Sequence, residues 1–161
     1  MHLKRLLKFL HTLGAIGLMG AMASLMAMHA FLPEPAALAE YARLRAAMGG
    51  IANWILIPSL VATLVGGLLA IAANRGYHDA GWVWVKLGFG IIVFEATLTA
   101  IHGPIRREAE ASGEALKTGV GAAELGATLQ SEWLALALML AIATANVVIG
   151  IWRPHWRRAR S

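Results

Sequence analysis

The chain has 161 residues, of which 58% are hydrophobic and 14% are charged, and its mean hydropathy is +0.63. This balance excludes a soluble protein, and the length leaves no room for a separate extramembrane domain with its own core. The absence of cysteine excludes disulfides, thiolate clusters, thiol nucleophiles and covalent haem attachment through a CxxCH sequence. The net charge of +5 comes mainly from the two ends of the chain, which favours contact with anionic lipid headgroups over nucleic-acid binding.

Four apolar stretches fill most of the sequence, at roughly 9–32, 51–73, 83–103 and 133–152. Each is about long enough to cross the ~30 Å hydrocarbon core as a helix. The sequence therefore predicts an all-α fold, a single domain over 1–161 with four transmembrane helices in an antiparallel bundle. Lysine and arginine gather at both termini, so we expect both ends in the cytoplasm and a multi-pass protein of the bacterial inner membrane.

The connections between these stretches carry their own expectations. Residues 43–48 predict a short interfacial helix that ends before Gly49 and Gly50. The third connection, 104–131, is polar and alanine-rich, and its periodicity predicts an amphipathic helix lying on the outer surface. All six tryptophans fall near expected span ends, as in an interfacial belt: Trp54, Trp82, Trp84, Trp133, Trp152 and Trp156.

Five ionisable side chains lie within the spans or at their edges: His11, His29, Lys86, Glu95 and His102. An ionisable side chain in lipid costs several kcal/mol and persists mainly where something binds it. Converting sequence position to depth at about 1.5 Å per residue gives two layers. The inner layer holds His11 and Lys86, with the further polar residues Asn146, Asn74 and Arg153. The outer layer holds His29, His102, Asn53 and Glu132, and Glu95 lies between the layers.

The first stretch also carries a stripe of soft ligands. Met19, Met22, Met26 and His29 follow one another at spacings of three, four and three, which places them on one helix face. Thioethers and imidazole suit Cu(I) and also serve as axial ligands to haem iron. The alternative is that these methionines fill gaps in apolar packing.

On the third stretch, Glu95, Thr99 and His102 share a face, while Lys86 points about 180° away from Glu95. These two ionisable residues therefore need different partners. Glu95 is the candidate for managing a proton, and Glu95 and Lys86 together are the candidate catalytic residues. The alternative for Glu95 is a neutral carboxyl group held by a hydrogen bond, and the alternative for Lys86 is a side chain that reaches the cytoplasm without a role.

Haem b fits these features best, because it needs only axial donors, a slot between helices and cations for its propionates. His11 is the preferred axial ligand, and Arg5, Lys8 and Arg153 are the candidate propionate partners. A second haem at the outer boundary, held by His29 or His102, would make the protein a transmembrane electron relay.

Several short runs occur in a fixed order along the chain: KFLHTLGAIG at 8–17, Met48 followed by ILIP at 55–58, GGLL at 66–69, GWVWVKL at 81–87 and VVIGIWRP at 147–154. In this order they resemble HemJ-type protoporphyrinogen oxidases and their CopD-like copper-resistance relatives. The resemblance implies a four-helix fold that binds haem b. It matches the first-helix histidine and third-helix lysine required in that family to His11 and Lys86.

The sequence departs from the family pattern after the first helix, at the start of the fourth helix, and at His102, which lies several residues beyond the family's third-helix histidine. We therefore expect a relative that keeps the scaffold and the haem but does not oxidise porphyrinogen.

The resulting prediction is a haem b-binding, electron-handling membrane protein of the oxidoreductase type. Its expected partners are membrane lipids and a quinone, a porphyrin or a membrane redox protein. Two alternatives stay open: a CopD-like protein that handles Cu(I) along the methionine stripe, with Met22 and Met26 as ligands, and a non-catalytic accessory subunit of a larger membrane complex. A homo-oligomer is a further expectation.

Overall fold

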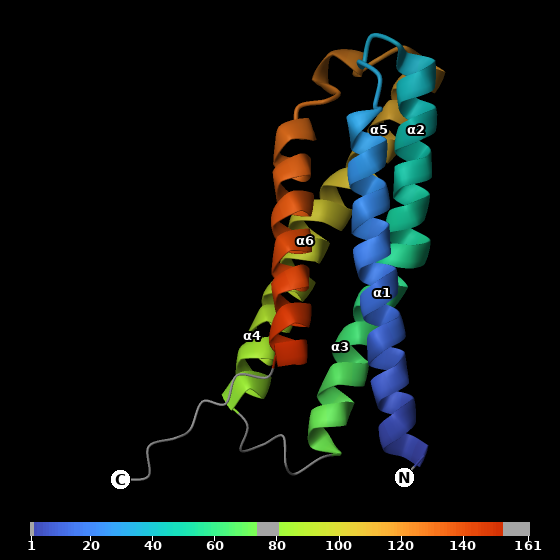
Figure 1. The fold of residues 1–161 in the computed structure, drawn as a ribbon. Helices are drawn as coiled ribbons and strands as arrows, with labels where there is room; N and C mark the ends of the chain where they lie inside the picture. Colours follow the sequence, from blue (N-terminus) through green and yellow to red (C-terminus); the bar gives the residue numbers. More distant parts are fainter. Residues whose placement is uncertain (1, 74–80, 153–161) are drawn as a thin grey trace.

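The computed structural model describes residues 2–73 and 81–152 (Figure 1). Within these ranges every regular element is a helix, and four helical segments are long and apolar enough to cross a membrane. The prediction of an all-α bundle of four membrane-spanning helices is therefore confirmed, and the chain is a multi-pass membrane protein.

The first and fourth segments are single helices, whereas the second and third each consist of three helical pieces joined end to end. The bounds are α1 His2–Ala30; α2 Leu38–Ile51, the π-helical η1 Ala52–Leu56 and α3 Ile57–Ala72; α4 Gly81–Ala96, the π-helical η3 Thr97–His102 and α5 Gly103–Thr118; the 3-10 turn η4 Ala122–Glu124; and α6 Leu129–Trp152.

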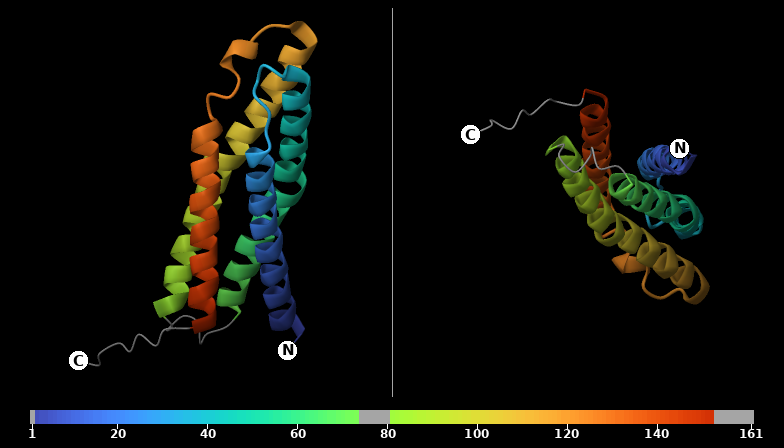
Figure 2. Two further views of the ribbon diagram at one scale, coloured as in Figure 1. Left: turned by 45° about the horizontal axis from the view of Figure 1, so that its top comes forward. Right: turned by 90° about the horizontal axis from the view of Figure 1, so that it is seen from below.

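The bundle has two distinct ends. At the basal end α1 begins and α6 finishes, and at the distal end α2 begins and α5 finishes (Figure 1). Toward the basal end α1 packs against α3, and α4 packs against α6, so the helices form two pairs (Figure 2). Both views show α2 and α5 side by side at the distal end.

The second and third segments, at 35 and 38 residues, are longer than a membrane requires. At 1.5 Å per residue each is more than 50 Å long, against about 30 Å of hydrocarbon. The helix runs through Gly49 and Gly50, where the sequence predicted a break. Gly49 lies against Ala109 of α5, whose Cβ would be only 3.3 Å from a Cβ at Gly49, so the glycine lets the two helices approach.

The third connection also differs from the expectation of a helix on the membrane surface over 104–131. Instead, α5 directly continues η3 and packs along α2. Pro104 lies directly after the π-helical turn η3. In a membrane-spanning helix such local π-helical adjustments re-satisfy the backbone groups that a proline leaves without a partner. The helix buries one face, formed by Ile105, Glu108, Ser112 and Ala115, and ends at Gly119 with a φ of 74°.

Exposed tryptophans lie at several heights along the bundle. Trp84 and Trp152 are 53% and 71% exposed near the basal end, Trp133 is 43% exposed near the start of α6, and Trp54 is 82% exposed in η1, at a height between them. Exposed aliphatic side chains of α1, α3, α4 and α6 lie on the same surface, as expected for a lipid-facing belt. The buried core lies between α1, η1, η3 and α6 and includes Leu18, Leu25, Met48, Leu56, Ile101 and Leu136.

Candidate functional site

The imidazole of His11 is held between α1 and α3. Its Nδ1 lies 2.6 Å from the backbone carbonyl oxygen of Thr63. A carbonyl oxygen only accepts hydrogen bonds, so Nδ1 must carry the proton and donate it. In the neutral imidazole the other ring nitrogen, Nε2, then keeps its lone pair. Metal-ligating histidines are commonly oriented by such a bond from one nitrogen to a backbone carbonyl, which leaves the other nitrogen to bind the metal.

Two glycines of α3 make room for this imidazole. A Cβ at Gly66 would come within 3.0 Å of the His11 backbone nitrogen, and a Cβ at Gly67 would come within 3.0 Å of Nδ1. One turn farther along α1, a Cβ at Gly14 would stand 2.6 Å from the Thr63 hydroxyl oxygen. Small residues therefore bring the two helices into backbone contact and fix the position of the ring.

Lys86 lies at the same level of the bundle as His11. The helices α1 and α6 are antiparallel, and toward their other end His29 of α1 contacts Glu132 of α6. His11 is eighteen residues from His29 along α1, and Gly150 is eighteen residues from Glu132 along α6. The Lys86 ammonium lies against Gly150, 2.6 Å from where its Cβ would stand. The structure thus places both residues at the basal level, with His11 on the α1–α3 pair and Lys86 on the α4–α6 pair.

The expected propionate partners begin at the same end. Arg5 and Lys8 are exposed on the basal turns of α1, and Lys8 lies three residues before His11, on the same face of the helix. Arg153 lies outside the described residues.

An apolar groove runs along α6 beside α1. It has a volume of about 740 Å³ and is lined by Met26 of α1 together with Ala137, Leu140, Ala141, Thr144, Ala145, Val148 and Ile149 of α6. Its volume lies in the ordinary range for a site that binds a small molecule or cofactor. The groove ends next to Gly150, so it reaches the level of His11 and Lys86.

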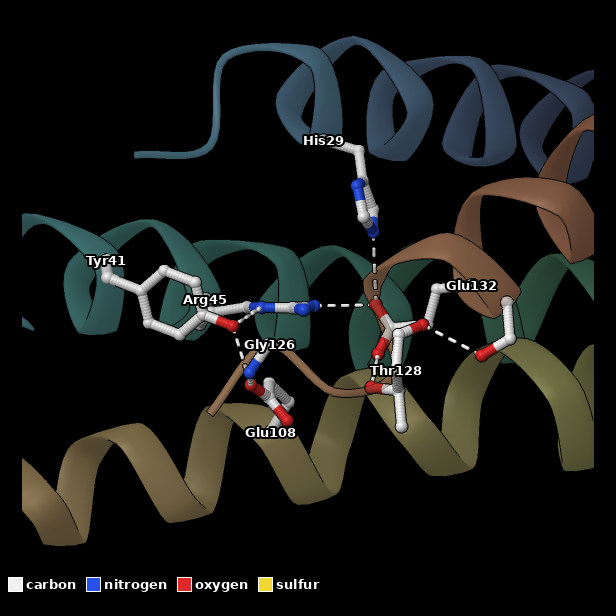
Figure 3. A network of polar contacts seen from close by, with 8 residues as sticks. His29, Tyr41, Arg45, Glu108, Gly126, Thr128 and Glu132 are labelled. Atoms are coloured by element: carbon white, nitrogen blue, oxygen red, sulfur yellow. Dashed lines mark hydrogen bonds and ion pairs between the residues drawn. The ribbon is translucent and has the colours of Figure 1, made fainter. Parts of the chain in front are cut away.

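A second polar site lies at the distal end, and much of it was not anticipated from the sequence (Figure 3). The Arg45 guanidinium donates from Nη1 to Oε2 of Glu132 at 2.7 Å, and both side chains are fully buried. The same Glu132 oxygen accepts from Nε2 of His29 at 3.2 Å, and Oε1 accepts from the Thr128 hydroxyl at 2.6 Å. Glu132 thus joins α1, α2 and the start of α6.

Tyr41 and Glu108 extend this network to α5. The Tyr41 hydroxyl donates to Oε1 of Glu108 at 2.6 Å and accepts from Nε of Arg45 at 3.2 Å. Oε1 of Glu108 also accepts from the backbone N–H of Gly126 at 2.6 Å. We call His29, Tyr41, Arg45, Glu108, Thr128 and Glu132 the distal cluster. These bonds join α1, α2, α5, α6 and the loop before α6, so the distal cluster holds these segments together at the distal end.

The distal cluster had a weak sequence signal. Tyr41 and Arg45 are four residues apart, which places them on one helix face, and Glu108, Ser112 and Ala115 repeat at helical spacing. What the sequence does not show is that these two faces meet.

The other expected metal ligands have separate partners. His29 belongs to the distal cluster, whereas Nε2 of His102 donates to the side-chain oxygen of Asn53 at 2.7 Å. Met22 is fully buried in the apolar core, and Met26 packs against that core and lines the groove. Within residues 2–73 and 81–152, no three His, Asp or Glu side chains gather as they would around a metal ion.

The two expected catalytic residues are not brought together. Glu95 is exposed on α4, whereas Lys86 is half-buried toward α6. Their roles in a reaction stay predictions.

Comparison with known proteins finds no match among family models, curated proteins or solved structures. The resemblance to the HemJ-type and CopD-like proteins therefore stays a hypothesis that rests on the short runs of sequence named above.

Proposed function

We propose that this chain is a haem b-binding membrane protein that handles electrons, with His11 as an axial ligand to the iron. The observation that carries the proposal is the bond from His11 Nδ1 to the Thr63 carbonyl oxygen. In the neutral imidazole this bond leaves Nε2 with a lone pair, which is the state that an axial histidine needs.

The surroundings of His11 fit the same group. The helix contact at Gly66 and Gly67 holds the imidazole in place, which lowers the entropy lost on binding. Arg5 and Lys8 offer cations on the basal turns of α1 for the propionates. When bound, haem b would supply one-electron chemistry at this level of the membrane.

We further propose that the basal end faces the cytoplasm of a bacterial cell, across its inner membrane. Lys4, Arg5 and Lys8 lie in the first turns of α1, and positive residues in short flanking segments favour the cytoplasmic side.

The test is haem occupancy of the full chain purified after expression with added haem. We expect a Soret band and about one haem b per His11 site, and an occupancy at least tenfold lower in His11→Ala. The matched control is His102→Ala. His102 is another histidine of a membrane-spanning segment, and its Nε2 already bonds to Asn53. Folded wild-type protein without a Soret band would contradict the proposal, and so would unchanged occupancy in His11→Ala. Copper without iron in the same sample would select the Cu(I)-handling alternative.

A further inference from the structure

A hollow lies where α1 ends and α6 begins, at the edge of two membrane-spanning helices. It has a volume of about 480 Å³ and is lined by His29, Leu32, Leu129, Gln130, Trp133 and Leu134. We call it the distal hollow. None of these six residues is Lys, Arg, Asp or Glu, so the distal hollow offers no cation to a phosphate group and suits a neutral molecule.

His29 presents one unused ring nitrogen to the distal hollow. Its side chain is only 5% exposed, and its Nε2 donates to the Glu132 carboxylate, while Nδ1 lies higher on the ring, away from Glu132 (Figure 3). Nδ1 has no hydrogen bond to any residue within 2–73 and 81–152. The buried polar atoms without a partner in these ranges belong to Arg45, Thr97 and Asn146, so Nδ1 keeps some accessible surface. A ligand in the distal hollow can therefore reach it.

The atom that suits Nδ1 best is a hydroxyl oxygen. A carboxylate oxygen only accepts hydrogen bonds, so Nε2 carries a proton whether the imidazole is neutral or charged. In the neutral ring Nδ1 accepts a hydrogen bond, and in the charged ring it donates one. A hydroxyl group can do both, so it satisfies Nδ1 in either state. Trp133 adds an aromatic wall, against which a second ring can stack or pack edge to face.

The apolar groove follows the distal hollow along the same face of α6. Trp133 of the hollow and Ala137 and Ala141 of the groove are spaced four residues apart, and on α1 Met26 lies three residues before His29. Both spaces are thus lined by these two helices, on one side of α6.

The groove has the length and the polarity for a hydrocarbon chain. From Trp133 to Ile149 the helix rises about 24 Å, most of the ~30 Å hydrocarbon core. The hydroxyl of Thr144, which lines the groove, already donates to the backbone oxygen of Leu140 at 2.8 Å. The other residues that line the groove are aliphatic or methionine.

We propose that the distal hollow and the groove together bind a membrane hydroquinone, a hydroxylated aromatic ring that carries one long hydrocarbon chain. A ring hydroxyl bonds to Nδ1 of His29, the ring packs on Trp133, and the chain lies along α6 toward Ile149. A neutral polar ring at the edge of the spans and a single chain within them match the chemistry and the order of the two spaces. The site is about 27 Å along α1 from His11, so this binding does not rest on the proposed haem.

The first experiment measures the heat of binding of decylhydroquinone to the full chain in micelles of a neutral detergent. Decylbenzene, with the same chain but no hydroxyl group, is the matched probe. We expect saturable binding of decylhydroquinone, and roughly 2- to 10-fold weaker binding of decylbenzene, the effect of one lost hydrogen bond. A diacylglycerol, which has one hydroxyl group but two chains and no ring, should not displace decylhydroquinone.

His29→Leu should remove the preference for decylhydroquinone over decylbenzene. This ratio of two affinities reports on Nδ1, because a general loosening of the site would weaken both probes alike. His29 also bonds to Glu132, so helical circular dichroism must show that the variant folds.

Two matched pairs leave the distal cluster intact. Ala141→Phe fills the groove and should weaken decylhydroquinone binding at least tenfold, whereas Leu138→Phe, at an exposed position of α6 outside the groove, should leave it unchanged. Trp133→Leu should also weaken binding, whereas Trp152→Leu, at another exposed tryptophan of α6, should not.

Four outcomes would overturn the proposal. The first is the absence of saturable binding of decylhydroquinone. The second is equal affinity for decylbenzene, which would show that the groove takes only a hydrocarbon chain. The third is full displacement by the diacylglycerol, which would assign the site to a lipid. The fourth is equal effects within the Ala141 and Leu138 pair. None of these readouts depends on haem, so this proposal can fail while the proposed function stands.

Discussion

Arg45→Met removes the positive charge from a fully buried ion pair at the distal end of the bundle. The variant leaves the Glu132 carboxylate buried with only His29 and Thr128 as donors, and it removes the donor to the Tyr41 oxygen. Breaking one side of a buried pair typically costs about 3–5 kcal/mol, mostly because the remaining charge is left without its partner. That corresponds to a loss of roughly two to four orders of magnitude in the folding equilibrium.

The assay is reversible unfolding in mixed micelles, followed by tryptophan fluorescence and helical circular dichroism. Arg106→Met is the matched control, because Arg106 pairs with Glu110 at 3.1 Å while their side chains are 52% and 63% exposed. Such a pair should contribute only about 0–0.5 kcal/mol after solvent screening. The double variant Arg45→Met with Glu132→Leu should recover much of the loss, since no unpaired charge remains. A cost for Arg45→Met as small as that of Arg106→Met, or a double variant no better than the single one, would refute this reasoning.

Three further substitutions test other contacts. Gly67→Ala puts a Cβ 3.0 Å from Nδ1 of His11, so haem occupancy measured by absorption should fall severalfold. Gly88→Ala, where a Cβ would meet open space, should leave the occupancy unchanged. Tyr41→Phe removes a hydroxyl that bonds to both Glu108 and Arg45 and should cost about 1–3 kcal/mol in the unfolding assay; a neutral effect would contradict its place in the distal cluster. Gly119→Ala should lower the free energy of unfolding by about 1–2 kcal/mol, because the φ of Gly119 is 74°. Gly113→Ala within α5 should leave that free energy unchanged or raise it by up to about 1 kcal/mol, and the reverse order would show that backbone conformation is not the cause.

Depth along the helices could be predicted from the sequence with few assumptions. An α-helix has a fixed rise per residue, so the expected basal level of His11 and Lys86 needed only the order of the spans. The structure agrees. His11 and Gly150 each lie eighteen residues from the contact between His29 and Glu132, and the Lys86 ammonium lies against Gly150. The opposite directions expected for Glu95 and Lys86 likewise followed from helix geometry alone.

Which faces of different helices meet was not predictable in the same way. Arg45 and Glu132 are 87 positions apart, and nothing in either local sequence indicates that α2 and α6 bring them within 2.7 Å. The helix break expected at Gly49 and Gly50 failed for a related reason. Glycine lowers helix propensity locally, but close packing of α2 on α5 outweighs that cost.

Hydrophobicity and length by themselves determined that this chain forms four membrane-spanning helices. Apolar runs of this length favour the bilayer, and a helix satisfies the backbone groups of each run within the run itself. Only the tertiary structure decided that His29 and Glu132 join a buried cluster, that His11 is oriented by a backbone carbonyl, and that Glu95 faces outward. Those outcomes depend on how helices rotate and pack against one another. That choice is made by side-chain contacts between segments far apart in the sequence.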